Sequence, residues 1–223
     1  MAYIEVQQAT RQFKNGEQVT VANRDISFEV DQGAVVVILG PSGAGKSTLL
    51  NILGGMDSPT SGRVLVDGVD IAQFNSRQLT TYRRQAVGFV FQFYNLVPNL
   101  TARENVELAS QITKDARDVD ETLTLVGLTH RSDNFPAQLS GGEQQRVAIA
   151  RALAVSPEAI LCDEPTGALD KKTGQQVMSL LLKVVKENKI MLLLVTHDPD
   201  IANTCDTIFR MDEGRICYVE NDS

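Results

Sequence analysis

A run of six apolar residues leads directly into a glycine-rich loop, and this junction constrains the fold more than any other feature. The run covers residues 34–39 and does not alternate with polar residues, which is typical of a strand buried on both faces. The segment after the loop carries Leu49, Leu50, Ile52 and Leu53 at helical spacing. The junction therefore predicts a buried parallel strand, a tight loop and a helix, the building unit of an α/β fold.

The loop itself matches the phosphate-binding pattern GxxxxGK[ST]. It consists of Gly40, Pro41, Ser42, Gly43, Ala44, Gly45, Lys46, Ser47 and Thr48. Glycines let backbone N–H groups curl around phosphate oxygens, and a helix N-terminus adds partial positive charge. Lys46 can reach the β- and γ-phosphates, the Ser47 hydroxyl can ligate Mg²⁺, and Thr48 is placed to bond an α-phosphate oxygen. The flanking strand and helix favour nucleotide binding over a glycine-rich turn that binds nothing.

A second apolar run, residues 159–163, ends in two adjacent carboxylates. At the carboxyl edge of a parallel sheet, beside the phosphate-binding loop, Asp163 can hold the Mg²⁺ shell. Because side chains alternate along a strand, we expect Glu164 on the other side, where it can polarise a water in line with the γ-phosphate. The alternative is an acidic turn after a strand. The phosphate-binding loop in the same chain makes that alternative the weaker one.

The remaining pattern predicts one compact domain with three parts. Residues 3–9, 19–30 and 62–66 favour antiparallel strands, and residues 212–214 a hairpin turn. A helical pattern runs from about residue 100 to residue 153. We therefore expect a β flank at about 1–31 and 62–70 and a helical subdomain at about 93–153, with the remainder as the α/β core.

Two further elements complete the predicted core. A third apolar run, residues 190–196, favours a parallel strand. A helix is expected to begin near Lys171, with a core-facing stripe at helical spacing. The residues of the stripe are Val177, Leu180, Leu181, Val184 and Val185.

Composition excludes several classes of protein. Hydrophobic residues make up 43% and charged residues 22%, as in ordinary globular proteins, and the net charge of −7 argues against a general nucleic-acid binder. The three cysteines lack the spacing of a disulfide or zinc framework. The first residues lack a signal-peptide pattern, and no apolar run is long enough to span a bilayer. We expect a cytoplasmic protein whose role at a membrane requires a partner.

Residues 139–146, Leu-Ser-Gly-Gly-Glu-Gln-Gln-Arg, precede an amphipathic helical pattern. Ser140 and Glu143 have the spacing of a capping box. Gly141 and Gly142 leave the first backbone N–H groups of the helix uncovered by side chains. The segment is therefore either a simple helix cap or a second anion site, since bare amides at a helix N-terminus bind phosphate.

This segment resembles the signature motif of ABC-transporter ATPases, and the order of the other motifs fits that family across essentially the whole chain. The resemblance implies a P-loop NTPase (RecA-like) parallel-sheet core with an antiparallel β flank and an inserted helical subdomain. It also implies a homodimer, in which Ser140, Gly141 and Gly142 contact the γ-phosphate of ATP held by the opposite subunit.

The resemblance assigns roles to four more residues. Gln92 matches the residue that senses Mg²⁺ and the attacking water and relays to the membrane partner. Asp170 lies in a loop expected at the subunit interface, and His197 matches the switch histidine that touches the γ-phosphate. Phe13 stands where the family has an aromatic residue that stacks on adenine. A structural histidine and a core-packing phenylalanine are the alternatives for the last two residues.

Four further stretches are similar to one branch of the family, which includes macrolide-export, lipoprotein-release, peptide-resistance and cell-division ATPases. They are residues 51–62, 88–96, 163–170 and 196–199. In that branch the partner is a membrane permease with a large extracytoplasmic domain. The resemblance thus implies a bacterial ATPase at the cytoplasmic face of the membrane, powering export, extraction or mechanotransmission. A non-transport ATPase acting on DNA or the ribosome is the alternative, and so is a purely regulatory mechanotransmission subunit. No nucleic-acid partner is expected.

Overall fold

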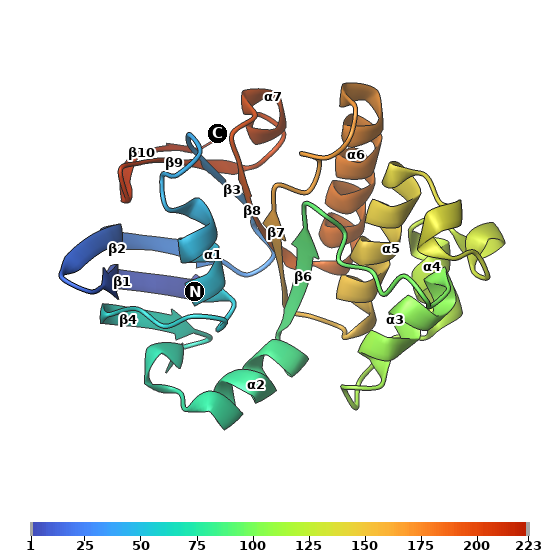
Figure 1. Cartoon of the computed structure of the whole chain (residues 1–223), viewed down its shortest axis with the longest axis horizontal. Helices are drawn as coiled ribbons and strands as arrows, with labels where there is room; N and C mark the ends of the chain where they lie inside the picture. The colour runs from blue at the N-terminus through green and yellow to red at the C-terminus, as the bar shows by residue number, and fades with distance from the viewer. Residues whose placement is uncertain (1, 222–223) are drawn as a thin grey trace. The chain divides into compact units, whose positions relative to one another are not determined.

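The computed structural model describes residues 2–221, which form two compact units. Unit 1 holds the chain through Arg83 and again from Met191 onward, and unit 2 holds Arg84–Ile190. Helix α2 (Ser76–Gln85) leads from the first unit into the second. Figure 1 follows the elements along the chain from blue to red. Both units combine helices with strands, so the predicted α/β class is confirmed.

Unit 1 contains an antiparallel sheet in the order β2-β1-β4-β5. Its strands are β1 (Ala2–Asn15), β2 (Gln18–Asp31), β4 (Ser61–Val66) and β5 (Val69–Asp70). Strand β1 pairs with both β2 and β4, which lie beside it in Figure 1. The predicted antiparallel flank is therefore confirmed. The first two strands extend further than predicted, to a hairpin at Gly16, where φ is 61°.

The other strands of unit 1 follow the order β10-β9-β3-β8. They are β3 (Val35–Leu39), β8 (Met191–Thr196), β9 (Thr207–Asp212) and β10 (Arg215–Asn221). Strand β3 pairs in parallel with β8 and β9, and β9 and β10 form the predicted hairpin. Every residue of β3 and β8 is buried, which explains why neither run alternates. Helices α1 (Lys46–Leu53) and α7 (Pro199–Ala202) each pack against β8.

Unit 2 pairs two parallel strands and carries four α-helices. The strands are β6 (Val87–Phe91) and β7 (Ala159–Asp163). The helices are α3 (Ala102–Ser110), α4 (Val119–Leu125), α5 (Gly141–Ala154) and α6 (Lys171–Asn188), with 3₁₀ turns at Thr129–Arg131 and Pro136–Gln138. Helix α5 contacts the other three helices and β6, so it forms the centre of this unit.

Two helices differ from the prediction. In α6 the buried face includes Met178, whereas Leu180 is only half-buried. Helix α2 was not predicted, because none of its residues is buried and it has no apolar stripe. Instead, the Tyr82 hydroxyl donates to the Leu53 carbonyl over 2.7 Å. Among the described residues, no helix has the length and apolar content that crossing a bilayer requires.

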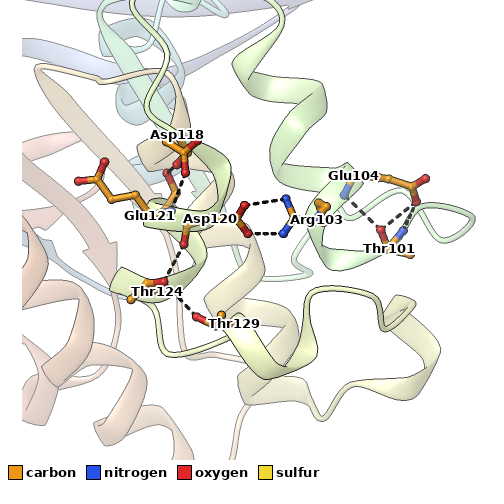
Figure 2. Close-up of polar contacts among 9 residues, drawn as sticks. Thr101, Arg103, Glu104, Asp118, Asp120, Glu121, Thr124 and Thr129 are labelled. Carbon is orange, nitrogen blue, oxygen red and sulfur yellow. Dashed lines mark hydrogen bonds and ion pairs between the residues drawn. The ribbon is translucent and has the colours of Figure 1, made fainter.

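Side-chain caps and an ion pair organise α3 and α4 (Figure 2). The Thr101 hydroxyl accepts a bond from the Glu104 N–H over 3.2 Å, and the Glu104 carboxylate accepts one from the Thr101 N–H over 2.7 Å. Asp118 caps the first turn of α4. Arg103 of α3 forms an ion pair with Asp120 of α4. The two short helices are thus fixed at their N-termini and to each other.

We predict that Thr101→Ala lowers the free energy of unfolding by about 1 kcal/mol, because α3 loses its N-cap. The matched control is Thr81→Ala, since this exposed hydroxyl donates to the Arg77 carbonyl within α2 and caps no helix. The control should change the free energy by less than about 0.5 kcal/mol. Urea unfolding of both variants tests this, and equal losses would contradict the assigned cap.

Candidate nucleotide-binding site

The glycine-rich loop joins β3 to α1 within unit 1. Gly43 and Gly45 have φ values of 81° and 98°, in the left-handed region that favours glycine. A Cβ atom at Gly45 would also lie 2.2 Å from the carbonyl oxygen of Ala22. Left-handed residues in such a loop turn successive N–H groups toward one side, the arrangement that binds anions.

Neighbouring strands hold this loop by its carbonyl groups. The Gly214 N–H, in the turn between β9 and β10, donates to the Ala44 carbonyl over 3.0 Å. The side-chain amide of Asn23 in β2 donates to the Gly45 carbonyl over 3.1 Å. Asn23 is completely buried, and no donor in the described part of the chain reaches its Oδ1. Asn23 was not predicted from the sequence, because it belongs to no recognisable motif.

The N-terminus of α1 is open to a ligand. Its N-cap is Gly45, and none of the described side chains caps the helix. Lys46 is buried at this end, and its ammonium group donates to the carbonyls of Gly40 and Pro41 over 2.8 and 2.9 Å. The exposed Ser47 occupies the first helical turn. Backbone donors, a cation and a hydroxyl therefore gather at one place.

The structure places His197 beside this loop. Thr196 ends β8 opposite Leu39 of β3, and its carbonyl accepts a bond from the Gly40 N–H over 3.2 Å. His197 comes directly after Thr196 and is exposed. Phe13 lies near the β1–β2 hairpin with 42% of its surface exposed, so the core-packing alternative for this ring is wrong.

In unit 2, Asp163 is the last residue of β7, as predicted. Glu164 lies beyond the strand with φ of 49°. The strand alternation used to orient Glu164 therefore does not apply, because a left-handed residue has left the pleat. Both carboxylates are half-buried. A non-glycine residue held in this sparsely populated conformation often marks a functional site.

Gln92 follows β6 and lies close to the loop after Glu164. A Cβ atom at Gly167 would meet the Gln92 Nε2 atom at 2.8 Å, so glycine allows the amide to approach. The Gly167 N–H in turn donates to the Glu164 carbonyl over 3.0 Å. Within unit 2, the structure thus brings together two segments that the sequence predicts to act on the same phosphate.

The predicted capping box of α5 is present. The Glu143 carboxylate accepts bonds of 2.8 Å from the N–H and from the hydroxyl of Ser140. Arg131 also reaches this carboxylate, with 3.2 Å between Nε and Oε1. The hydrogen bonds from Ser140, and to a lesser degree the charge of Arg131, lower the pKa of Glu143.

Asp170 is the N-cap of α6 and accepts bonds of 3.1 Å from the N–H groups of Lys172 and Thr173. Hydrogen bonding with Thr173 lowers the pKa of this carboxyl. A Cβ atom at Gly142 would lie 2.5 Å from the Thr173 methyl carbon, so the first turns of α5 and α6 touch. The position of Asp170 therefore has a structural explanation, while its role at a subunit interface stays a prediction.

A buried glutamine and an arginine of α5 were missed by the sequence analysis. Gln145 is completely buried and donates to the Phe91 carbonyl, directly before Gln92, over 3.3 Å. The Arg151 guanidinium donates to the Tyr94 carbonyl over 3.0 Å, and burial lowers its pKa. Both side chains fix the segment around Gln92 to α5. The available sequence signal for the burial of Gln145 was its spacing, because Gln145 and the apolar Ile149 stand four positions apart on one helix face.

Comparison with known proteins gives consistent matches. Residues 23–167 match the ABC transporter family model. The chain is 45% identical over 197 residues to the lipoprotein-releasing system ATP-binding protein LolD of Bordetella pertussis, covering 86% of this chain and 85% of that protein. It is 44% identical over 219 residues to the macrolide export ATP-binding/permease protein MacB of Marinobacter nauticus, covering 96% of this chain and 34% of that longer protein.

A solved structure matches along nearly the whole chain. It is the dimeric, post-hydrolysis state of the ATP-binding cassette MJ0796 bound to ADP and Pi, a protein of Methanocaldococcus jannaschii. The TM-score is 0.89 at 40% identity, covering 98% of both chains. Together with the matches to LolD and MacB, this similarity confirms the resemblance drawn from the motifs.

The lowered pKa of Glu143 predicts a pH-dependent contribution to stability. Because its folded-state pKa lies below the ordinary value of 4.5, the carboxylate stabilises the fold at pH above 4.5. This contribution is lost as the pH falls below that value. Urea unfolding of the protein and of Glu143→Gln should therefore differ more at pH 7 than at the lowest pH at which both remain folded. The same difference at both pH values would contradict the assignment.

Proposed function

This chain belongs to the ABC transporter family, and from that membership we propose that it is the ATP-hydrolysing subunit that drives a separate membrane permease. The observation that carries the proposal is the loop between β3 and α1, with its left-handed Gly43 and Gly45 and the buried ammonium of Lys46. A helix N-terminus without a side-chain cap, next to a cation, suits the β- and γ-phosphates of ATP. Thr48 serves the α-phosphate, and Phe13 offers an exposed face for the adenine.

The donor atoms that the family resemblance assigns to Mg²⁺ suit this ion. Mg²⁺ prefers oxygen ligands, usually one or two from the protein with the remainder from phosphate and water. The Ser47 hydroxyl, the Asp163 carboxylate and the Gln92 amide oxygen are such donors, and none of these residues is fully buried. Bound there, the ion would neutralise charge that develops on the phosphate oxygens.

In the proposed hydrolysis, Lys46 holds the β- and γ-phosphates while Glu164 orients a water and accepts its proton. The water oxygen bonds to the γ-phosphorus, and the bond to the bridging oxygen of ADP breaks. His197 and Gln92 position the γ-phosphate and the water. The φ of 49° at Glu164 supports this role, since it turns the carboxylate away from the line of the strand.

Two copies of the chain are proposed to act together. The start of α5 presents the N–H groups of Gly141 and Gly142 behind the Ser140 cap, which suits a second set of contacts to a γ-phosphate. ATP held by one subunit would then join it to its partner, and hydrolysis would release the pair. The dimeric cassette MJ0796 with ADP and Pi supports this arrangement.

The partner is proposed to be a permease at the cytoplasmic membrane. LolD is named as part of a lipoprotein-releasing system, and MacB joins an ATP-binding part and a permease in one protein. The chain would work at the cytoplasmic face of the membrane, with the exposed Phe93 beside Gln92 as part of the surface that meets the permease.

We predict that Glu164→Gln lowers the hydrolysis rate by roughly 10²- to 10⁴-fold, because the general base is lost. ATP binding should persist, and the variant should elute as a dimer in ATP on size-exclusion chromatography. Glu158→Gln is the matched control, because this exposed glutamate precedes the strand that Glu164 follows. A monomeric Glu164→Gln protein with bound ATP would contradict the dimer mechanism.

We also predict that EDTA abolishes hydrolysis and that added Mg²⁺ restores it. Asp163→Asn should raise the Mg²⁺ concentration needed for half-maximal activity by about 10- to 100-fold, the effect expected when a metal site loses support. Asp115→Asn, a change at an exposed aspartate of unit 2, should leave this concentration unchanged. Equal Mg²⁺ dependence of the two variants would remove Asp163 from the metal site.

A further inference from the structure

A guanidinium group covers one face of the Phe13 ring. The Cζ atom of Arg11 lies 4.6 Å from the ring centroid. Both residues belong to β1, and positions two apart in a strand point to the same side. Because 42% of the Phe13 surface is exposed, the ring still has surface to offer to a ligand.

The Arg11 guanidinium is held by the Asp57 carboxylate through two parallel contacts. Nε donates to Oδ2 over 2.8 Å, and Nη2 lies 2.8 Å from Oδ1. The two side chains are only 24% and 27% exposed. A planar bidentate pair of this kind fixes both the position and the plane of the guanidinium, which a lysine ammonium would not do.

Asp57 is in turn attached to the helix that begins in the phosphate-binding loop. Its N–H donates over 3.2 Å to the carbonyl of Asn51 in α1. Three residues further on, Thr60 donates its N–H to the Thr10 carbonyl over 2.7 Å, and its hydroxyl accepts a bond from the Gln12 N–H over 3.0 Å. The segment after α1 is therefore bonded to β1 on both sides of Arg11.

We propose that Arg11, locked by Asp57, is the positioning residue that presents the Phe13 ring to the adenine of ATP. This inference rests on the proposed function, in which Phe13 stacks on the base. A cation on one face holds the ring by attraction to its quadrupole and leaves the opposite face for the nucleobase. Through Asp57, the base platform and the phosphate-binding helix α1 keep a fixed relation within unit 1.

The competing explanation is purely structural: the Arg11–Asp57 pair only stabilises the β1–β2 hairpin. The two explanations differ in their ligand dependence. If Arg11 positions the Phe13 ring, its loss weakens the binding of ligands that carry a base. If the pair is purely structural, its loss distorts the phosphate-binding loop and weakens the binding of every ligand that carries the phosphates. Inorganic tripolyphosphate has the phosphates without the base, so it separates the two explanations.

The test measures dissociation constants of the full chain for MgATP and for magnesium tripolyphosphate by calorimetry. Arg11→Met removes the cation and the bidentate pair but keeps an unbranched side chain. We expect it to weaken ATP binding by roughly 3- to 10-fold, because the cation–π contact that orders the Phe13 ring is lost. Tripolyphosphate binding should stay unchanged. Arg11→Lys, which keeps a cation, should lose less.

Arg63→Met is the matched control. It breaks another Arg–Asp pair of unit 1, in which Arg63 Nε lies 3.1 Å from Asp70 Oδ2. This pair involves β4 and β5 and not the Phe13 ring. The control should bind both ligands as the unmodified protein does.

Phe13→Ala separates the failure of this inference from the failure of the proposed function. We expect Phe13→Ala to weaken ATP binding, and Arg11→Met to add nothing in the Phe13→Ala background.

If Phe13→Ala weakens ATP binding but Arg11→Met and Asp57→Asn do not, the positioning role is overturned and base stacking stands. If Arg11→Met weakens the binding of ATP and of tripolyphosphate equally, the purely structural explanation replaces ours. If Phe13→Ala has no effect, the stacking role and the inference fall together, while ATPase activity still decides the proposed function.

Discussion

The structure depends on keeping the N-terminus of α1 open and in a fixed position. The first backbone N–H groups of any helix have no partner within it, and most proteins satisfy them with a side-chain cap. Here the N-cap is Gly45, which has no side chain to offer. The surrounding elements bind the loop by its carbonyl groups instead, through Gly214 and Asn23. These bonds hold the loop at its carbonyl groups, so that in the proposed function its N–H groups serve the phosphates.

Helix α5 treats its N-terminus differently. Ser140 and Glu143 satisfy part of it with a capping box, and two glycines follow the cap. Such an end can add donors to an anion, but it lacks the lysine and the glycine-rich loop found at the N-terminus of α1. In the proposed mechanism, this difference is the reason for two copies. The loop of one copy would hold the triphosphate, and the helix end of the other would bind its terminal phosphate.

Prediction from the sequence worked where one residue type has one physical consequence. The buried strands were visible because β3 and β8 are apolar throughout, and the capping box because Ser140 and Glu143 have a fixed spacing. It failed where the backbone departs from a regular period. The left-handed φ of Glu164 breaks the alternation used to orient it, and α2 has no apolar stripe.

Long-range partners were invisible in the sequence for a different reason. Asn23 and Gln145 are polar residues in the core, and each acts through a carbonyl group far away in the sequence. The pairing of Arg11 with Asp57 likewise spans 46 positions. No local pattern encodes such a contact, because its geometry exists only after the sheet has formed. Gln145 lies inside the recognised segment 139–146, whereas Asn23 and Arg11 lie outside any motif, but the partner of each was invisible.

The most direct test is a cross-link between the phosphate-binding loop and the start of α5. Ser42→Cys and Gln138→Cys would be introduced on separate copies carrying Glu164→Gln and Cys217→Ser, which leaves two buried cysteines. The copies would be mixed and treated with a short bis-maleimide. The account predicts an inter-subunit product that forms with ATP and is absent without nucleotide. Efficient ATP binding without that product would contradict the shared γ-phosphate on which the mechanism rests.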